Sequence, residues 1–140
     1  MNWRIICPKI FNFTVFSYFC SVIIKGVKIL VLTETDACCG PMAAAFLRDY
    51  SPALKVVSAG RNPIQSVDLL MVEAMHECLI DLDHYVPFDV KTIDVSTFDV
   101  VYECPEIESP RAVEAYRIKR DFIKNEVFVF FKSLCLRQIN

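Results

Sequence analysis

The residues best suited to chemistry lie in a short polar loop, 33–40, whose sequence is TETDACCG. It follows an apolar run and ends at Gly40-Pro41, where a helix is expected to begin. A strand, a loop and a helix N-terminus in this order often bind phosphate, because loop amides and the helix dipole attract an anion. This loop carries two acids and no base. An oxyanion would therefore meet carboxylates, and each like-charge contact at about 4 Å costs ~1 kcal/mol in water.

Thiols are the second chemical feature of this region. Cys38 and Cys39 are adjacent in the loop, and Cys104 ends a later apolar run. The helix N-terminus would lower the pKa of Cys39, whereas Glu34 and Asp36 would raise it. The three thiols could carry out redox chemistry or bind a soft metal, or they could be small buried apolar side chains. No Cys-x-x-Cys spacing supports a zinc site, and we predict no metal and no cofactor.

Short apolar runs alternate with helical stripes, and these elements must position the loop. Strands are expected at 27–32, 53–60 and 98–104, and helices at 41–50, 66–79 and after 109. The alternation predicts an α/β domain with a small doubly wound parallel sheet of three to four strands and helices on both faces. Ligands of such sheets bind at the carboxyl ends of the strands. The loop 33–40, the turn at Ser58–Gly60 and the segment after Cys104 should therefore converge at one rim.

Composition limits the class of protein. The chain has 140 residues, a net charge of −2 and no broad basic surface, which argues against nucleic-acid binding. The odd count of seven cysteines indicates a reducing compartment with mostly free thiols, so we predict a cytoplasmic location. We assign 27–137 to the domain and 1–26 to an apolar N-terminal extension. The uncharged run 10–24 is shorter than the about 20 residues that span a membrane, so an anchor is disfavoured. The extension could instead be an edge strand, or a segment not native to the fold, which we favour.

Four segments, ILVLTETDACCGPMAAAFLRDY, VVSAG, IDLDHYVP and FDVVYEC, follow one another in the order found in low-molecular-weight protein tyrosine phosphatases. From 27 to about 135 the chain resembles this family, which shares its fold with thioredoxin-coupled arsenate reductases. The resemblance implies an anion-binding loop made of Glu34, Thr35, Asp36, Ala37, Cys38, Cys39 and Gly40. It also implies that Ser58 and His84 support the loop, His84 through hydrogen bonds.

The family's catalytic residues are a Cys, an Arg separated from it by five residues and an Asp before the last helix. Thr33, Cys39 and Ser109 occupy these positions here. We therefore predict a catalytically degenerate phosphatase-like protein that acts by binding. The alternatives are a thiol oxidoreductase of the arsenate-reductase kind, using Cys38, Cys39 and Cys104, and an atypical active phosphatase.

Partners are expected at the rim around the loop 33–40, either a protein or a small ligand. Only the segment 105–109 separates the third strand from the last helix, so a fourth strand hardly fits, and the open sheet edge invites a homodimer. Arg48 and Arg61 could supply a replacement cation at the rim. The basic residues of the last helix, Arg117, Lys119, Arg120 and Lys124, are interpreted as a solvated face, and His76 as a solvated residue.

Overall fold

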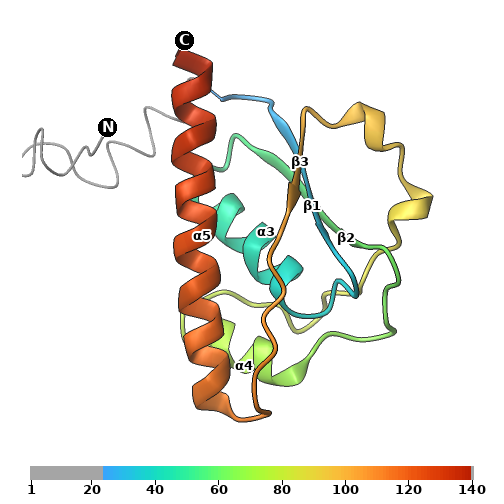
Figure 1. The fold of residues 1–140 in the computed structure, drawn as a ribbon, viewed down its shortest axis with the longest axis vertical. Coiled ribbons are helices and arrows are strands. Elements are labelled where there is room, and N and C mark those ends of the chain that lie inside the picture. Colours follow the sequence, from blue (N-terminus) through green and yellow to red (C-terminus); the bar gives the residue numbers. More distant parts are fainter. Residues whose placement is uncertain (1–23, 140) are drawn as a thin grey trace, which may run out of the picture.

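A computed structural model describes residues 24–139 of the chain. The elements are β1 (Lys28–Thr33), α3 (Cys39–Tyr50), β2 (Lys55–Gly60), α4 (Leu69–His76), the 3-10 helices η1 (Val90–Thr92) and η2 (Val95–Thr97), β3 (Val100–Glu103) and α5 (Val113–Ile139). Strands and helices alternate as the sequence predicts (Figure 1). Of the extension, only 24–26 falls within the described residues, so the predictions for 1–23 remain untested.

The sheet has three parallel strands in the order β2-β1-β3, which confirms the predicted small parallel sheet. β1 lies in the centre, and its residues Ile29, Leu30 and Val31 are fully buried, as expected for a continuous apolar run between two strands. In the register, Thr33 is opposite Gly60 and Leu32 is opposite Glu103. The carboxyl ends of all three strands therefore meet at one rim, next to the loop 33–40.

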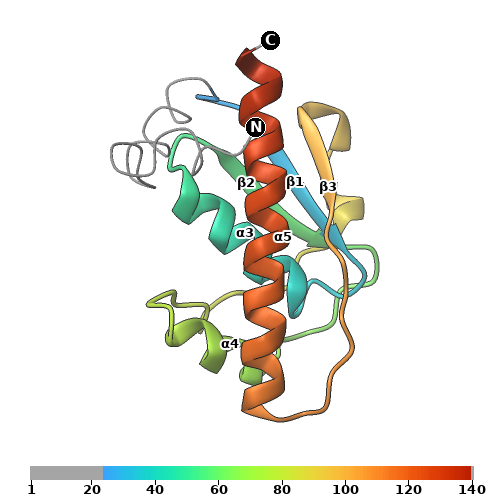
Figure 2. The same cartoon turned by 60° about the vertical axis from the view of Figure 1, so that its left-hand side comes forward.

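Two helices cover one face of this sheet. α3 packs on β1 and β2, and α5 packs on α3 (Figures 1 and 2). The connection from α4 to β3, with η1 and η2, lies on the opposite side (Figure 1). On α5, Tyr116, Ile123 and Val127 are buried at a helical spacing. The predicted α/β domain with a small parallel sheet is confirmed, and the second face of this sheet is covered mainly by irregular chain with the 3-10 helices η1 and η2.

The helix α4 is shorter than the predicted 66–79. It begins at Leu69 because the side chain of Asp68 caps it, accepting a hydrogen bond from the backbone N–H of Leu70 at 3.0 Å. It ends at His76, and Leu79 then takes a left-handed conformation with φ of 62°. The chain turns away from the helix axis at this point, which places the segment 80–88 beside the rim of the sheet.

The strand β3 forms one edge of the sheet. Within residues 24–139 no further strand pairs with it, and Val101 is 42% exposed. Its neighbour Tyr102 points to the opposite face and stacks on Phe130 of α5, with 4.4 Å between ring centroids. One face of β3 is thus held by α5, while its outer edge has no paired strand in the described part of the chain.

Ile24 is fully buried in the core, although it falls within the predicted extension. Two residues later, the backbone N–H of Gly26 donates to the carbonyl of Ala53 at 3.1 Å, so this part of the chain is also held against the domain. No helix among residues 24–139 is both long enough and apolar enough to cross a membrane.

Candidate functional site

The loop 33–40 is a tight turn that packs directly on β2. Thr33 ends β1, and its buried Oγ1 accepts a hydrogen bond from the backbone N–H of Asp36 at 3.2 Å. Asp36 has a left-handed backbone conformation, with φ of 53°, which Asp tolerates better than most residues. A Cβ at Gly60 would lie 2.9 Å from the carbonyl oxygen of Glu34, so the loop can approach β2 this closely only at a glycine.

The carboxylate of Asp36 is the centre of the loop and is fully buried. It accepts hydrogen bonds from the hydroxyl of Ser58, from the hydroxyl of Tyr85 at 2.5 Å and from the backbone N–H of Phe88 at 2.8 Å. Burial raises the pKa of Asp36, and these three hydrogen bonds oppose the rise. The side chain therefore ties the loop to β2 and to the segment 85–88.

The contacts of Asp36 show where the two residues predicted to support the loop, Ser58 and His84, lie. Ser58 contacts the loop directly through Asp36. His84 is exposed, and the hydrogen bond expected from it is made by the next residue, Tyr85. The support from this segment therefore comes from a phenol, not from the imidazole of His84.

Carboxylates also surround the outer side of the loop. The backbone N–H of Glu34 donates to the carboxylate of Glu106 at 2.9 Å, and Asn62 donates to the carboxylate of Glu34. Among residues 24–139, the guanidinium group of neither proposed replacement cation forms a hydrogen bond or an ion pair with the loop 33–40. Arg61 pairs with Glu103 at 2.6 Å, and Arg48 donates to the carbonyl of Val56 at 2.9 Å. One loop amide is therefore already bound to an anion that the chain itself supplies.

The two vicinal thiols lie where the loop enters α3. The neighbouring Cys38 thiol, the backbone N–H of Ile107 and Lys119 lower the pKa of Cys39, and burial opposes them. The interaction with Cys39 and burial raise the pKa of Cys38. Of the two thiols, Cys39 is therefore the one that ionises more readily.

Cys104 is also at the rim, but its environment differs. Its thiol donates to the backbone carbonyl of Cys39 at 3.5 Å, and burial raises its pKa. All five cysteines of the described residues are free thiols: Cys38, Cys39, Cys78, Cys104 and Cys135. The three thiols predicted to lie at one rim do come together there, and Cys39 is the one with a lowered pKa.

Lys119 is the residue at this site that sequence reasoning missed. Its side chain is only 6% exposed, and its Nζ lies 3.8 Å from Cys38 Sγ and 4.4 Å from the centre of the Tyr116 ring. Within residues 24–139 it forms no ion pair with a carboxylate. The interpretation as a solvated residue was wrong, because Lys119 lies on the same helical stripe as Tyr116, Ile123 and Val127. That spacing was the available signal.

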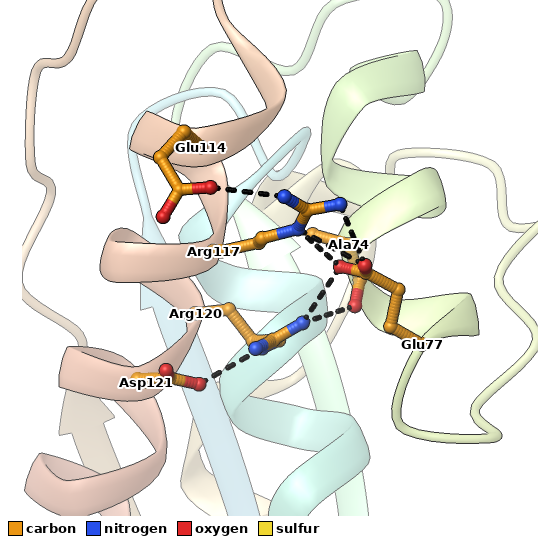
Figure 3. A network of polar contacts seen from close by, with 6 residues as sticks. All are labelled: Ala74, Glu77, Glu114, Arg117, Arg120 and Asp121. Carbon is orange, nitrogen blue, oxygen red and sulfur yellow. Dashed lines mark hydrogen bonds and ion pairs between the residues drawn. The ribbon is translucent and has the colours of Figure 1, made fainter.

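Two further basic residues of α5 connect it to α4. Arg117 and Arg120 both bind the carboxylate of Glu77, at 2.9 Å and 3.0 Å, and connect the end of α4 to α5 (Figure 3). Figure 3 also shows the second partners of the two guanidinium groups, Glu114 for Arg117 and Asp121 for Arg120. This network holds the two helices together on the side of α5 next to Lys119.

A cavity of about 370 Å³ opens between the loop and α5. Its lining consists of Thr35, Cys38, Cys39, Glu106, Ile107, Glu108, Ser109, Arg111, Tyr116 and Lys119. Arg111 and the hydroxyl of Tyr116 bind Asp68, at 3.2 Å and 2.5 Å. The buried Oγ of Ser109 has no hydrogen-bond partner among residues 24–139. The cavity thus offers two thiols, both signs of charge and one unsatisfied hydroxyl.

One group of potential metal ligands occurs in the described residues, outside this cavity. His76, Asp81 and Asp83 are exposed, and their ligand atoms all lie within 4.8 Å of one another. His76 is exposed, as predicted, and its Nε2 lies 3.4 Å and 3.3 Å from the two carboxylates. The arrangement is typical of a surface contact between a histidine and two carboxylates.

The fold defined by this sheet and loop is that of low-molecular-weight tyrosine phosphatases and arsenate reductases. An arsenate reductase in its phosphate-binding state superimposes with a TM-score of 0.67 at 19% identity, covering 76% of this chain and 98% of that chain. The YwlE arginine phosphatase from Geobacillus stearothermophilus gives 0.63 at 20% identity, covering 81% and 96%. A low-molecular-weight phosphotyrosine phosphatase from Vibrio cholerae gives 0.65 at 19% identity, covering 78% and 97%. No family model and no curated protein matches the sequence.

Proposed function

We propose that this chain is a catalytically degenerate protein of the phosphatase fold that acts by binding. The observation that carries the proposal is the contact between the Glu34 amide and the Glu106 carboxylate, at 2.9 Å. An amide that would bind an oxyanion in an active loop is bound to an internal anion instead. Fully buried Asp36 adds a second carboxylate to the interior of the same loop.

The residues at the three catalytic positions lack the required chemistry. The Thr33 hydroxyl is buried, and its oxygen accepts a hydrogen bond from a backbone amide within the loop. Deprotonation of such an alcohol requires an adjacent base. Cys39 bears no fixed positive charge to stabilise a transferring phosphoryl group. Ser109 is an alcohol and does not protonate a leaving group as a carboxylic acid does. A phosphotyrosine phosphatase reaction through these residues is therefore not expected.

The binding surface that we propose is the rim formed by the loop and the cavity beside it. The cavity reaches the loop at Thr35 and reaches α5 at Lys119. A small ligand or a segment of a partner protein would contact both. β3 ends at the same rim, and its outer edge pairs with no other strand of residues 24–139, so a second copy of the chain could pair with it.

An aryl phosphate assay tests the loss of catalysis. We expect no turnover of a small aryl phosphate by the full chain. Turnover that the variant Thr33→Ala abolishes would overturn the proposal, since it would identify Thr33 as a working nucleophile.

A phosphate titration followed by the amide resonances of the loop tests the charge argument. We expect no shift in the unmodified chain, and tighter phosphate binding by Glu106→Gln because the competing carboxylate is gone. The variant Glu108→Gln is a matched control, since Glu108 lines the same cavity and has no hydrogen bond to the loop amide. Phosphate bound to the loop of the unmodified chain would contradict the proposal.

A relay of the arsenate-reductase kind through Cys104 has less support. The Cys104 thiol is buried and donates to a carbonyl oxygen, and burial raises its pKa. These features favour a thiol that stays protonated. The low pKa of Cys39 does favour thiol chemistry at this rim, but without Cys104 as a partner.

A further inference from the structure

Lys119 is a buried charge that lines an open cavity without a carboxylate partner. The residue is 6% exposed, and within residues 24–139 it forms no ion pair. Its Nζ contacts the Cys38 thiol at 3.8 Å and lies 4.4 Å from the centre of the Tyr116 ring. Contact with Cys39 and burial raise the pKa of Cys38, so this thiol supplies no negative charge at neutral pH. Burying an ammonium group without an anion is costly, so the cavity is suited to a ligand that brings one.

Glu108 and Ser109 offer two further unused groups in the same cavity. Glu108 is exposed, and in the described part of the chain it pairs neither with Lys119 nor with any other base. The adjacent Ser109 has a buried Oγ that lacks a partner among the same residues, and buried polar atoms normally have one. The cavity therefore presents an ammonium, a carboxylate and a hydroxyl whose bonding capacity a ligand can use.

The two other charged residues of the lining are already engaged. Arg111 pairs with Asp68 at 3.2 Å, and Glu106 accepts a hydrogen bond from the Glu34 amide at 2.9 Å. Lys119 and Glu108 are thus the charges left for a ligand in this cavity. They have opposite signs, so a simple anion would face Glu108 and a simple cation would face Lys119, whereas a zwitterion can pair with both.

A second cavity, which we call the apolar cavity, adjoins the first and has the same volume of about 370 Å³. Both volumes lie within the roughly 300–1,000 Å³ of small-molecule sites. The two cavities share part of their lining, namely Ile107, Glu108, Ser109 and Lys119. The rest of the apolar cavity is lined by Pro110, Ala115, Ile118 and Phe122. Ile118 is 66% exposed and Phe122 is 46% exposed, so two large apolar side chains are available beside the charged groups.

We propose that the two cavities together bind a free α-amino acid with a large apolar side chain. The carboxylate of the ligand pairs with Lys119, its ammonium group pairs with Glu108, and its side chain packs in the apolar cavity against Ile118 and Phe122. Ser109 Oγ donates to the same carboxylate. The inference rests on the proposed function, because it names the class of ligand that the binding protein takes.

The experiment titrates the full chain with phenylalanine at neutral pH and follows the backbone amide resonances of residues 107–109 by NMR. We expect saturable shifts at these residues. Phenethylamine, which lacks the carboxylate, should bind about tenfold or more weakly, since it leaves the buried Lys119 without an anion. Hydrocinnamate, which lacks the ammonium group, should bind only about two- to fivefold more weakly, because Glu108 is exposed. Glycine, which lacks the apolar side chain, should bind about tenfold or more weakly.

One analogue separates a free amino acid from a segment of a partner protein. N-acetylphenylalanine amide has the same side chain but no charge, as a residue inside a polypeptide does. It should bind about tenfold or more weakly than phenylalanine, since neither Lys119 nor Glu108 gains a counter-charge.

Variants assign each charge of the ligand to its residue. Lys119→Met should weaken phenylalanine binding about tenfold or more and leave phenethylamine binding unchanged, because that analogue has no carboxylate to lose. Glu108→Gln should weaken phenylalanine binding about two- to fivefold and should not weaken hydrocinnamate binding. The matched controls are Lys124→Met and Glu126→Gln, since both residues are exposed on α5 and line neither cavity. A variant that folds poorly would lose every ligand alike, which distinguishes it from the selective losses expected here.

Three results would overturn the proposal. The first is the absence of saturable shifts at residues 107–109, which would mean that Lys119 already has its counter-charge within the chain. The second is binding of the uncharged analogue as tight as that of phenylalanine, which would favour a protein segment. The third is an equal loss of phenylalanine and phenethylamine binding in Lys119→Met.

These titrations do not depend on catalysis, so the two proposals can fail separately. Aryl phosphate turnover that Thr33→Ala abolishes would refute the loss of phosphatase activity and leave the measured amino-acid binding in place. Failure of phenylalanine to bind would refute this ligand class and leave the loss of catalysis in place.

Discussion

Replacing Asp36 by alanine should remove the central support of the loop. Ser58 and Phe88 would lose the acceptor for a hydroxyl and a backbone N–H in a buried environment, whereas the Tyr85 hydroxyl would keep the Ser58 carbonyl as an acceptor at 3.2 Å. Each buried donor left without an acceptor costs about 1–3 kcal/mol, so two cost about 2–6 kcal/mol. Alanine at φ of 53° adds about 1 kcal/mol. The total of about 3–7 kcal/mol is a large part of the 5–15 or so that stabilise an ordinary domain.

Two further variants at the same position separate these contributions. Asp36→Gly removes the acceptors but relieves the backbone, so it should be about 1 kcal/mol more stable than Asp36→Ala. Asp36→Asn keeps an acceptor oxygen and removes a buried charge, and it should match or exceed the unmodified chain at neutral pH. Urea unfolding followed by far-ultraviolet circular dichroism measures all three, because α3, α4 and α5 dominate that signal.

The pH dependence of Asp36→Asn gives the sign of the charge effect. Burial raises the folded pKa of Asp36 above the ordinary 3.8. The folded state therefore favours the protonated acid, and the stability it contributes is complete below pH 3.8 and lost as pH rises through the folded pKa. The advantage of the asparagine variant should thus appear only above that range. An alanine variant that costs less than about 1 kcal/mol, or an asparagine variant as unstable as alanine, would refute the role given to Asp36.

Three further predictions use other contacts. Ile24→Ala should lower the free energy of unfolding by about 2–4 kcal/mol, because Ile24 is fully buried; urea titration measures this, and a loss near zero would place the residue outside the core. Arg120→Met should lower the free energy of unfolding by about 1 kcal/mol, and Arg117→Met should lower it by less. The reason is that Arg120 is less exposed and also donates to a backbone carbonyl. Thermal melts measure both variants, and the reverse order of melting temperatures would contradict the network. Gly60→Ala should destabilise the fold more than Gly40→Ala. A Cβ at position 60 would contact backbone atoms, whereas a Cβ at position 40 would contact mainly side chains. Equal melting temperatures of the two variants would contradict this prediction.

The fold could be predicted because its signals are local. The apolar run of β1 and the Gly40-Pro41 helix start are read from neighbouring residues, and parallel pairing then brings the strand ends together. The convergence of Cys39 and Cys104 at one rim followed from that topology alone. No knowledge of individual side-chain contacts was needed for it.

The details of the site depend on distant contacts. The bond between Glu34 and Glu106 joins residues 72 positions apart, and the contact of Lys119 with Cys38 joins residues 81 positions apart. No sequence pattern around either glutamate indicates such a contact. The charge of Lys119 favoured a solvated interpretation, although its place on the buried stripe of α5 argued against it. The support from Tyr85 was missed because its hydrogen bond joins it to Asp36, 49 positions away in the sequence.

The long helix α5 also has a consequence for the order of events during biosynthesis. It is translated after all three strands, yet it supplies Tyr116, Ile123 and Val127 to the core and packs on both α3 and α4. A nascent chain that contains the sheet but not α5 would expose the apolar face of α3. The thiol of Cys39 would also lack Lys119 during that interval, so one of the groups that lower its pKa arrives only when α5 docks.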